Sequence, residues 1–278
     1  MPLKICVLGS GSGGNCTAIW TNKEAILLDC GGFSLEYIEF NLNKLKINPN
    51  NIKGIVISHG HGDHVNNTTF KLSQKYEIPI YIHNKTFQII EKRYKDKLDK
   101  LSIKSHFRFH PDTQFRVDSF NIIPFEIYHD DNYGDNKYVG KPFGFCVHLN
   151  HNKNLRKIGY LTDTRIVNSG ILNALYDIHA CILESNHDYE LIQEQGPIHP
   201  GWKQHLSNEK AGDIISWISQ NSNIDSKLKV FLAHVSRSHN TPKKPFIKIN
   251  QILKKNNIRN VQLLPTFQYQ KSKVLNIA

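Results

Sequence analysis

Short apolar runs recur along the chain, and polar or amphipathic segments separate them. Apolar runs of about four to eight residues between turn signals are typical of buried strands, whereas helical spacing of apolar residues indicates amphipathic helices. Strands are therefore predicted at 3–9, 16–20, 25–29, 55–57, 78–82, 107–109, 114–117, 120–128, 143–149, 157–164, 180–184, 228–233 and 261–264. Helices are predicted at 34–46, 69–76, 85–94, 171–178, 208–219 and 244–255. The lysine-rich residues 95–104 are expected at the surface.

Six of the predicted strands share a feature, because a histidine, aspartate or glutamate stands where each one ends. These residues are Asp29, His59, His129, Asp163, Glu184 and His234. Helices separate many of the strands, and the repeated order of strand, polar residue and helix indicates an α/β protein. Chance placement would not give six such endings, so we interpret them as parts of one functional site.

The densest group of polar residues follows the strand at 55–57. His59, His61, Asp63 and His64 lie within six residues of one another. Imidazoles and a carboxylate that are buried together need partners, so this stretch is predicted to be a metal-binding loop at the end of a rigid strand. His59 and His61 can bind one ion, and Asp63 and His64 can bind a second.

Glycine separates these residues at positions 60 and 62, and its freedom in φ is expected to let the loop fold back. The alternative is a histidine-rich surface loop that binds metal by accident. Residues elsewhere in the chain argue against this alternative. His129 ends an apolar, alternating strand and can be a third ligand to the first ion. Asp163 is the natural bridge between two ions, because a carboxylate offers two oxygens.

Two other segments are expected to border the site. Asp29 is either an ordinary cap at a strand end or an acceptor that orients a ligand histidine, and we favour the second interpretation. The glycine-rich residues 9–15 resemble a phosphate loop only poorly, because no Gly-Lys-Ser/Thr follows and the next residues are strand-like. We expect a tight connection between two strands there.

Composition adds a preference about partners. The chain has 278 residues, a formal net charge of +11, 39% hydrophobic and 21% charged residues, which suits a globular protein. Such a charge either serves general solubility or favours a polyanionic partner such as nucleic acid. The five cysteines form no CxxC pair, and no apolar run approaches the length of a membrane span. We expect no signal peptide, no membrane association and a cytoplasmic location.

The motif His59-Gly60-His61-Gly62-Asp63-His64 resembles the His-x-His-x-Asp-His signature of the metallo-β-lactamase superfamily. His129, Asp163 and His234 follow in the order expected of its later ligands. Within that superfamily the chain is most similar to the YycJ/WalJ group of DNA exonucleases. The stretches that carry this likeness are the glycine-rich opening, residues 184–188, 205–208 and 234–236, and Asn240. Gly60 and Gln204 depart from the group, which usually has Glu and Gly at these positions.

The resemblance implies one domain over residues 1–278 with an αββα four-layer sandwich. It implies that His59, His61 and His129 bind the first ion, that Asp63, His64 and His234 bind the second, and that Asp163 bridges them. Nitrogen and oxygen ligands suit Zn²⁺, Mn²⁺ or Fe, and the spacing does not choose among these.

The residues expected to take part directly in catalysis are Asp63, Glu184 and His205. The placement of Glu184 and His205 is similar to an acid–histidine pair in tRNA 3′-processing enzymes of the superfamily. Glu184 is therefore expected to orient His205, which would act as a general acid; a satisfied histidine at a helix start is the alternative.

Substrate contacts are expected at Asn186, His187 and Ser207. For His187 the alternative is a local structural role, and Ser207 also fits an N-cap of the helix at 208–219.

The function favoured by these observations is a metal-dependent phosphodiesterase that acts on nucleic acid, DNA rather than RNA, as an exonuclease. The first alternative is a hydrolase of small esters, thioesters or lactones on the same two-metal core. A non-catalytic nucleic-acid-binding module and a redox enzyme are weaker alternatives, because all seven ligand positions are intact and no room remains for a flavin domain. The formation of a homo-oligomer is left open by the sequence.

Overall fold

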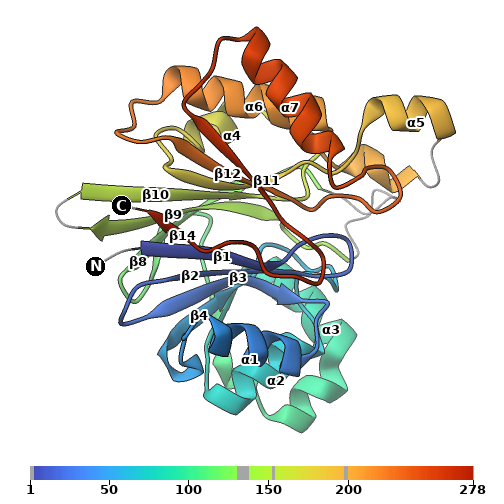
Figure 1. The fold of residues 1–278 in the computed structure, drawn as a ribbon. Coiled ribbons are helices and arrows are strands. Elements are labelled where there is room, and N and C mark those ends of the chain that lie inside the picture. Colours follow the sequence, from blue (N-terminus) through green and yellow to red (C-terminus); the bar gives the residue numbers. More distant parts are fainter. Residues whose placement is uncertain (1–2, 130–137, 152–153, 197–199, 278) are drawn as a thin grey trace.

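The computed structural model describes residues 3–129, 138–151, 154–196 and 200–277. Two mixed sheets pack face to face, and helices cover the outer face of each (Figure 1). This is the predicted αββα four-layer sandwich, and the prediction of the fold class is therefore confirmed. In the described part of the chain, no helix combines the length and hydrophobicity that a bilayer crossing requires.

The first sheet contains seven strands in the spatial order β14-β1-β2-β3-β4-β5-β6. The strands are β14 (Leu275–Ile277), β1 (Leu3–Gly9), β2 (Asn15–Trp20), β3 (Ala25–Gly31), β4 (Ile52–Val56), β5 (Ile80–Ile82) and β6 (Phe107–Phe109). Strands β3 to β6 run parallel, because helical crossovers connect most of them, whereas the β14, β1, β2 and β3 pairings are antiparallel.

The second sheet repeats this plan with the order β13-β12-β11-β10-β9-β8-β7. Its strands are β7 (Phe115–Val117), β8 (Phe120–Glu126), β9 (Phe143–His151), β10 (Asn154–Leu161), β11 (Ala180–Glu184), β12 (Leu228–Ala233) and β13 (Val261–Pro265). Strands β10 to β13 are parallel and the others are antiparallel.

The helices lie on the two outer faces. On the first sheet they are α1 (Leu35–Lys44), α2 (Asn67–Tyr76) and α3 (Asn84–Leu101), and on the second sheet α4 (Ser169–Ala174), α6 (Asn208–Asn221) and α7 (Lys244–Lys255). Helix α5 (Tyr189–Gln195) projects from one end of the sandwich (Figure 1). Short 3-10 helices occur at η1 (Pro49–Asn51), η2 (Lys104–His106) and η3 (Pro200–Gln204).

One apolar core lies between the sheets. Ile5, Ile19 and Val56 of the first sheet pack in one cluster with Phe145 and Phe231 of the second. Separate clusters fill the space beneath the helices of each face. All five cysteines are buried and unpaired, as expected for small apolar side chains.

Several elements have other bounds than predicted, among them α4 and β10, and three differ most. Helix α3 continues to Leu101 instead of ending at Tyr94, where the backbone leaves helical geometry (φ −120°, ψ 20°) and the helix kinks. Helix α5 and strand β14 were not predicted, because each is short and has too few apolar residues to show a period.

The strand registers bring the polar strand ends together. Leu28 of β3 pairs with Val56 of β4, so the residues that follow these strands leave the sheet side by side. In the second sheet Leu161 pairs with Leu183, and Glu184 pairs with Ala233. The ends of β10, β11 and β12 therefore meet at one edge, opposite the loop that follows β4.

Candidate metal centre

Three histidines form the first cluster at this edge. Nε2 of His59 lies 3.0 Å from Nδ1 of His61, and Nε2 of His129 lies 3.1 Å from the same atom. Tetrahedral ligands about 2.0–2.1 Å from a zinc ion are separated by roughly 3.3 Å. The three nitrogens therefore have the spacing of ligands that share one ion, as the sequence predicted for these residues.

The second cluster contains Asp63, His64 and His234, whose candidate ligand atoms lie within 4.8 Å of one another. Oδ2 of Asp63 is 3.3 Å from Nε2 of His64 and 3.4 Å from Nε2 of His234. His234 follows β12, so this cluster joins the two sheets.

Asp163 lies between the clusters. Its Oδ1 is 3.9 Å from Nε2 of His129 and 3.4 Å from Nε2 of His234. Its Oδ2 is 3.2 Å from Nε2 of His64, yet it is buried and accepts no hydrogen bond of good geometry from a described residue. Burying a carboxylate oxygen without a well-aligned hydrogen bond costs free energy. A cation beside the oxygen would offset that free energy. The donor set thus fits two divalent ions.

The first cluster keeps its imidazoles neutral. Burial lowers the pKa of His59 and His61, and it lowers the pKa of His129 to about 3. A neutral imidazole keeps one nitrogen lone pair, which a metal ligand needs.

The second cluster favours positive charge. Burial lowers the pKa of His234, but Asp163, Asp63 and Glu184 outweigh burial and raise it to about 10. The pKa of His64 is likewise raised, because three carboxylates outweigh its burial. Burial raises the pKa of Asp163, but the histidines around it hold that pKa well below its usual range. The carboxylates therefore stay ionised, and a bound cation would supply the positive charge that they favour.

Asp29 orients two of the rings from behind. Its Oδ2 lies 2.7 Å from Nδ1 of His64 and accepts a hydrogen bond of 2.8 Å from Oγ of Ser58. Because Ser58 directs its proton at Asp29, its oxygen can accept from Nδ1 of His59, 3.0 Å away. In both rings Nε2 is then left to face the centre. The prediction that Asp29 is an acceptor for a histidine of the site is confirmed, and it extends to a second histidine.

Three residues of the centre have left-handed backbone geometry. The φ angles are 54° at Asp29, 59° at Asp163 and 51° at His234. Asp163 and His234 follow the ends of β10 and β12, and Asp29 lies near the end of β3. Such strained residues persist only where the surrounding structure fixes them, and they gather at functional sites.

Glu184 at the end of β11 contacts two histidines. Its Oε1 lies 2.7 Å from Nδ1 of His205 and 3.1 Å from Nδ1 of His234. Burial raises the pKa of Glu184, but His205 and His234 outweigh burial and bring it to about 2. Its Oε2 accepts from the backbone N–H of Leu206. Nδ1 of His205 is thereby engaged, which argues against a metal-ligand role for that atom, although His205 lies in the same cluster as Asp163.

The sequence analysis missed Asn15, which follows the glycine-rich connection from β1 to β2. Its Nδ2 lies 3.2 Å from Oδ2 of Asp63 and 3.1 Å from Nε2 of His64. Its Oδ1 accepts from Oγ of Ser10, and Ser10 in turn accepts from the backbone N–H of His234. The connection was expected beside the site, and its tight glycine-rich sequence was the available signal for Asn15.

The predicted substrate contacts Asn186, His187 and Ser207 all lie near the centre and all are buried. Asn186 donates to the carbonyl of His234, and Ser207 caps α6 through its hydroxyl. Neither ring nitrogen of His187 has a hydrogen-bond partner among the described residues. Direct contact of these three residues with a substrate stays a prediction.

Neither Gly60 nor Gly62 has a positive φ, so glycine's freedom in φ is not what requires glycine at these positions. Gly60 is needed for close approach instead. A Cβ at this position would lie 2.7 Å from the carbonyl oxygen of Tyr138, whereas one on Gly62 would meet nothing nearer than 4.0 Å. Arg93 of α3 donates to the carbonyl oxygens of Gly60 and Tyr138, at 2.7 and 3.0 Å, and holds the two segments together.

The chain is similar to known proteins in sequence and in fold. Residues 25–218 match the family described as the beta-lactamase superfamily domain. The exodeoxyribonuclease YycJ of Bacillus anthracis is 26% identical over 264 residues, which cover 91% of this chain and 90% of that protein. The exodeoxyribonuclease WalJ of Streptococcus pneumoniae is 28% identical over 245 residues, which cover 85% of this chain and 83% of that protein.

A solved structure shares the architecture at low sequence identity. Zinc-bound PqqB from Methylobacterium extorquens aligns with a TM-score of 0.69 and 12% identity, over 99% of this chain and 100% of that one. At this identity the likeness concerns the fold.

Proposed function

The chain belongs to the metallo-β-lactamase superfamily, and from that premise we propose that it is a two-metal phosphodiesterase, an exonuclease whose substrate is DNA. The observation that carries this proposal is the pair formed by Glu184 and His205 beside the histidine–aspartate clusters, with 2.7 Å between Oε1 and Nδ1. The two curated relatives named as exodeoxyribonucleases support the same substrate class. The net charge of +11 suits a polyanion.

In this proposal His59, His61 and His129 hold one divalent ion, Asp63, His64 and His234 hold the other, and Asp163 contacts both. Paired divalent ions lower the pKa of water toward neutrality and offset the charge on phosphate oxygens. The nitrogen and oxygen donors suit Zn²⁺ or Mn²⁺, and also Fe.

The chain's own residues prepare the proton transfer. Glu184 accepts a hydrogen bond from Nδ1 of His205, and this bond fixes the orientation of the ring. Nε2 is then free to carry the proton that the leaving oxygen needs. The side chain of His205 is 17% exposed, so it can reach a substrate, whereas Glu184 is fully buried. Asp63 serves as ligand and, through its charge, helps to hold His234 in place.

The alternative predicted from sequence, a hydrolase of small esters, thioesters or lactones, would be favoured by an apolar pocket with few basic residues. Two mostly apolar cavities beside the site loops also contain basic residues, Arg237 in one and Arg165 with Lys210, next to Asp213, in the other. Their basic residues suit an anionic substrate.

We include in the proposal that residues 1–278 act as one hydrolase domain, because a single core joins the two sheets. The five buried, unpaired cysteines fit a reducing compartment such as the cytoplasm.

The test is to incubate the purified protein with Mn²⁺ or Zn²⁺ and end-labelled single- and double-stranded DNA and RNA, beside a panel of lactones and thioesters. Stepwise shortening of DNA is expected. Turnover of lactones or thioesters with intact nucleic acids would contradict the proposal.

A further inference from the structure

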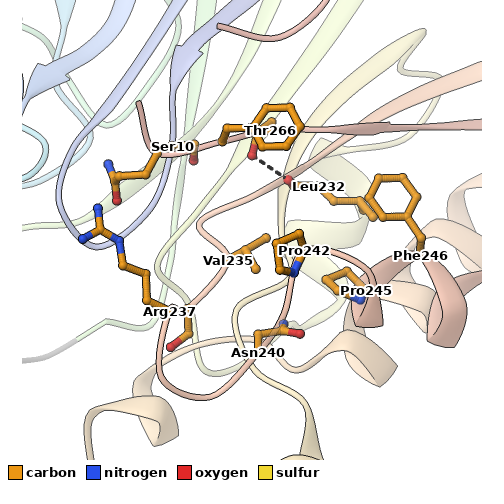
Figure 2. Close-up of a pocket in the computed structure, with 12 residues that line it drawn as sticks. Ser10, Leu232, Val235, Arg237, Asn240, Pro242, Pro245, Phe246 and Thr266 are labelled. Atoms are coloured by element: carbon orange, nitrogen blue, oxygen red, sulfur yellow. Dashed lines mark hydrogen bonds between the residues drawn. The ribbon is translucent and has the colours of Figure 1, made fainter. Parts of the chain in front are cut away.

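A cavity of about 310 Å³ lies beside the metal centre, at the ends of β12 and β13 and the start of α7 (Figure 2). Its walls include Val235 and Arg237, which follow His234 in the chain, and Phe246 of α7. The volume is at the lower end of the range of about 300–1,000 Å³ found for small-molecule sites. It can accept a flat group such as a nucleobase, and it excludes a duplex.

Hydrogen bonds of two residues, Ser10 and Asn15, link the cavity wall to the second cluster. Ser10 lines the cavity, and its hydroxyl accepts the backbone N–H of His234 at 2.9 Å. The same hydroxyl donates to Asn15, whose amide contacts Asp63 and His64. The lining residues Ser10 and Val235 therefore adjoin the candidate ligand His234, which suits the cavity to a substituent next to a phosphate at the centre.

The cavity combines positive charge with aromatic surface. Arg237 lines the cavity, and its guanidinium carbon lies 5.1 Å from the centre of the Tyr269 ring, which lies next to the lining. Tyr269 is 61% exposed. Phe246 and Phe267 contribute further rings to the walls. Arginine planes and aromatic rings that stack on bases are typical of proteins that bind single strands.

Most polar groups of the wall are already paired. The amide of Asn240 donates to the carbonyl of Asn186 and to Oδ1 of Asn208. The amide of Gln268 contacts the backbone of Gly13 and Gly14, and Thr266 donates to the carbonyl of Leu232 (Figure 2). Few donors and acceptors remain to read the edge of a base. The cavity is suited to the face of any base, independent of sequence.

We propose that this cavity binds the nucleoside adjacent to the phosphodiester held at the metal centre, in a single strand of DNA, with the base against Arg237, Phe246 and Phe267. The inference rests on the proposed function, since it assigns part of the same substrate. The negative charge of the DNA strand complements Arg237. The cavity volume of about 310 Å³ suits a single nucleoside of that strand.

The experiment measures binding apart from cleavage. Metal-loaded protein is titrated against a fluorescent, cleavage-resistant phosphorothioate single strand, and binding is followed by anisotropy. A series of strands lacks one base at a time. Arg237→Ala and Tyr269→Ala are compared with Arg259→Ala, which removes an exposed arginine between α7 and β13 outside the cavity. Melting temperatures check that each variant is folded.

The expected result is a loss of affinity of at least about fivefold in the Arg237 and Tyr269 variants, as for loss of one stacked base, and less than about twofold in Arg259→Ala. At one strand position, removal of the base should weaken binding to the wild type as much as Arg237→Ala does. Arg237→Ala should then bind the strand that lacks this base no more weakly than it binds the complete strand.

Equal affinities of Arg237→Ala and Arg259→Ala would overturn the inference, as would a wild type that binds every abasic strand equally or binds no single strand. Base-dependent binding without any cleavage of nucleic acid would leave the cavity assignment in place and contradict the proposed function. Cleavage of DNA without base-dependent binding would agree with the proposed function and contradict the cavity assignment.

Discussion

Oδ2 of Asp29 lies 2.7 Å from Nδ1 of His64, and both side chains are completely buried. The same oxygen accepts hydrogen bonds from Ser58 and from the hydroxyl of Tyr160. One carboxylate thus sets the orientation of His64 directly and of His59 through Ser58. The acceptor behind a ligand histidine fixes its tautomer and strengthens it as a donor to metal.

Replacing Asp29 with Asn should therefore weaken metal binding, because an amide offers only one acceptor oxygen where the carboxylate offers two. Asn tolerates the left-handed backbone that Asp29 adopts, so the fold should be kept. The expected loss of metal affinity is about 10- to 100-fold, measured by titration with Zn²⁺ against a competing chelator.

Asp96→Asn is the control, since Asp96 is exposed on α3. It should bind metal as the wild type does. Wild-type affinity in Asp29→Asn would show that the second acceptor oxygen and the charge of Asp29 are not needed for metal binding.

Asn15→Ala should lower the affinity for one ion of the two. The amide of Asn15 contacts Asp63 and His64 but no residue of the first cluster. Metal analysis after dialysis against a weak chelator should give one ion per chain for the variant and two for the wild type. The control is Asn22→Ala, in the exposed turn between β2 and β3. Loss of both ions together, or of neither, would contradict this role.

The strand ends of the site could be read from the sequence because each follows a local apolar run. Asp163, Glu184 and His234 are the residues at or after the ends of β10, β11 and β12, and Asp29 lies two residues before the end of β3; all four strands have parallel neighbours. Parallel strands end at the same edge of a sheet. The local apolar pattern and the sheet topology therefore both predict that these residues lie close together.

Asn15 and Gly60 could not be interpreted in this way. The contact of Asn15 with Asp63 joins residues 48 positions apart, and the need for glycine at position 60 comes from a carbonyl in residue 138. Strand β14 pairs with β1 at the far end of the chain. Such features depend on tertiary contacts that leave no period in the sequence.

Gly60→Ala should disturb the first cluster, whereas Gly62→Ala should not. The added methyl group of the first variant would lie 2.7 Å from the carbonyl oxygen of Tyr138, and backbone must move to admit it. Overpacking of this kind costs about 1–3 kcal/mol. We expect a lower melting temperature and weaker metal binding for Gly60→Ala, and wild-type values for Gly62→Ala, measured by thermal unfolding with and without metal. Equal behaviour of the two variants would contradict the close approach.

A pH prediction follows from His110, which lies outside the metal centre. Burial lowers the pKa of His110 to about 4, and its ring stacks on Phe115 at 4.8 Å. The unfolded chain titrates near pH 6.5, so between these values the unfolded state binds more protons. This contribution to stability is therefore complete above about pH 6.5 and is lost as the pH falls toward 4.

His110→Phe should remove that contribution. Between pH 8 and pH 5 the wild type should lose about 2 kcal/mol more unfolding free energy than the variant. Urea unfolding of both proteins at the two pH values measures the difference. Parallel losses in the two proteins would show that His110 does not titrate on unfolding.

The role proposed for His205 predicts a dependence on the leaving group. The oxygen expelled from a DNA phosphodiester is a strongly basic alkoxide that needs a proton, whereas p-nitrophenolate leaves without one. His205→Ala should therefore lower kcat for single-stranded DNA by about 10²- to 10⁴-fold. For the p-nitrophenyl ester of thymidine 5′-phosphate the change should be less than about tenfold, because no general acid is required.

Metal content decides whether this difference reports on proton transfer. His205→Ala should keep two ions, because Nδ1 of His205 lies closer to Oε1 of Glu184, at 2.7 Å, than to Oδ1 of Asp163, at 3.6 Å, and is not among the proposed ligands. His148→Ala, in β9, is the matched control and should cleave both substrates at the wild-type rate. Equal losses on the two substrates, or loss of an ion, would mean that His205 acts through the metal site and does not supply the proton.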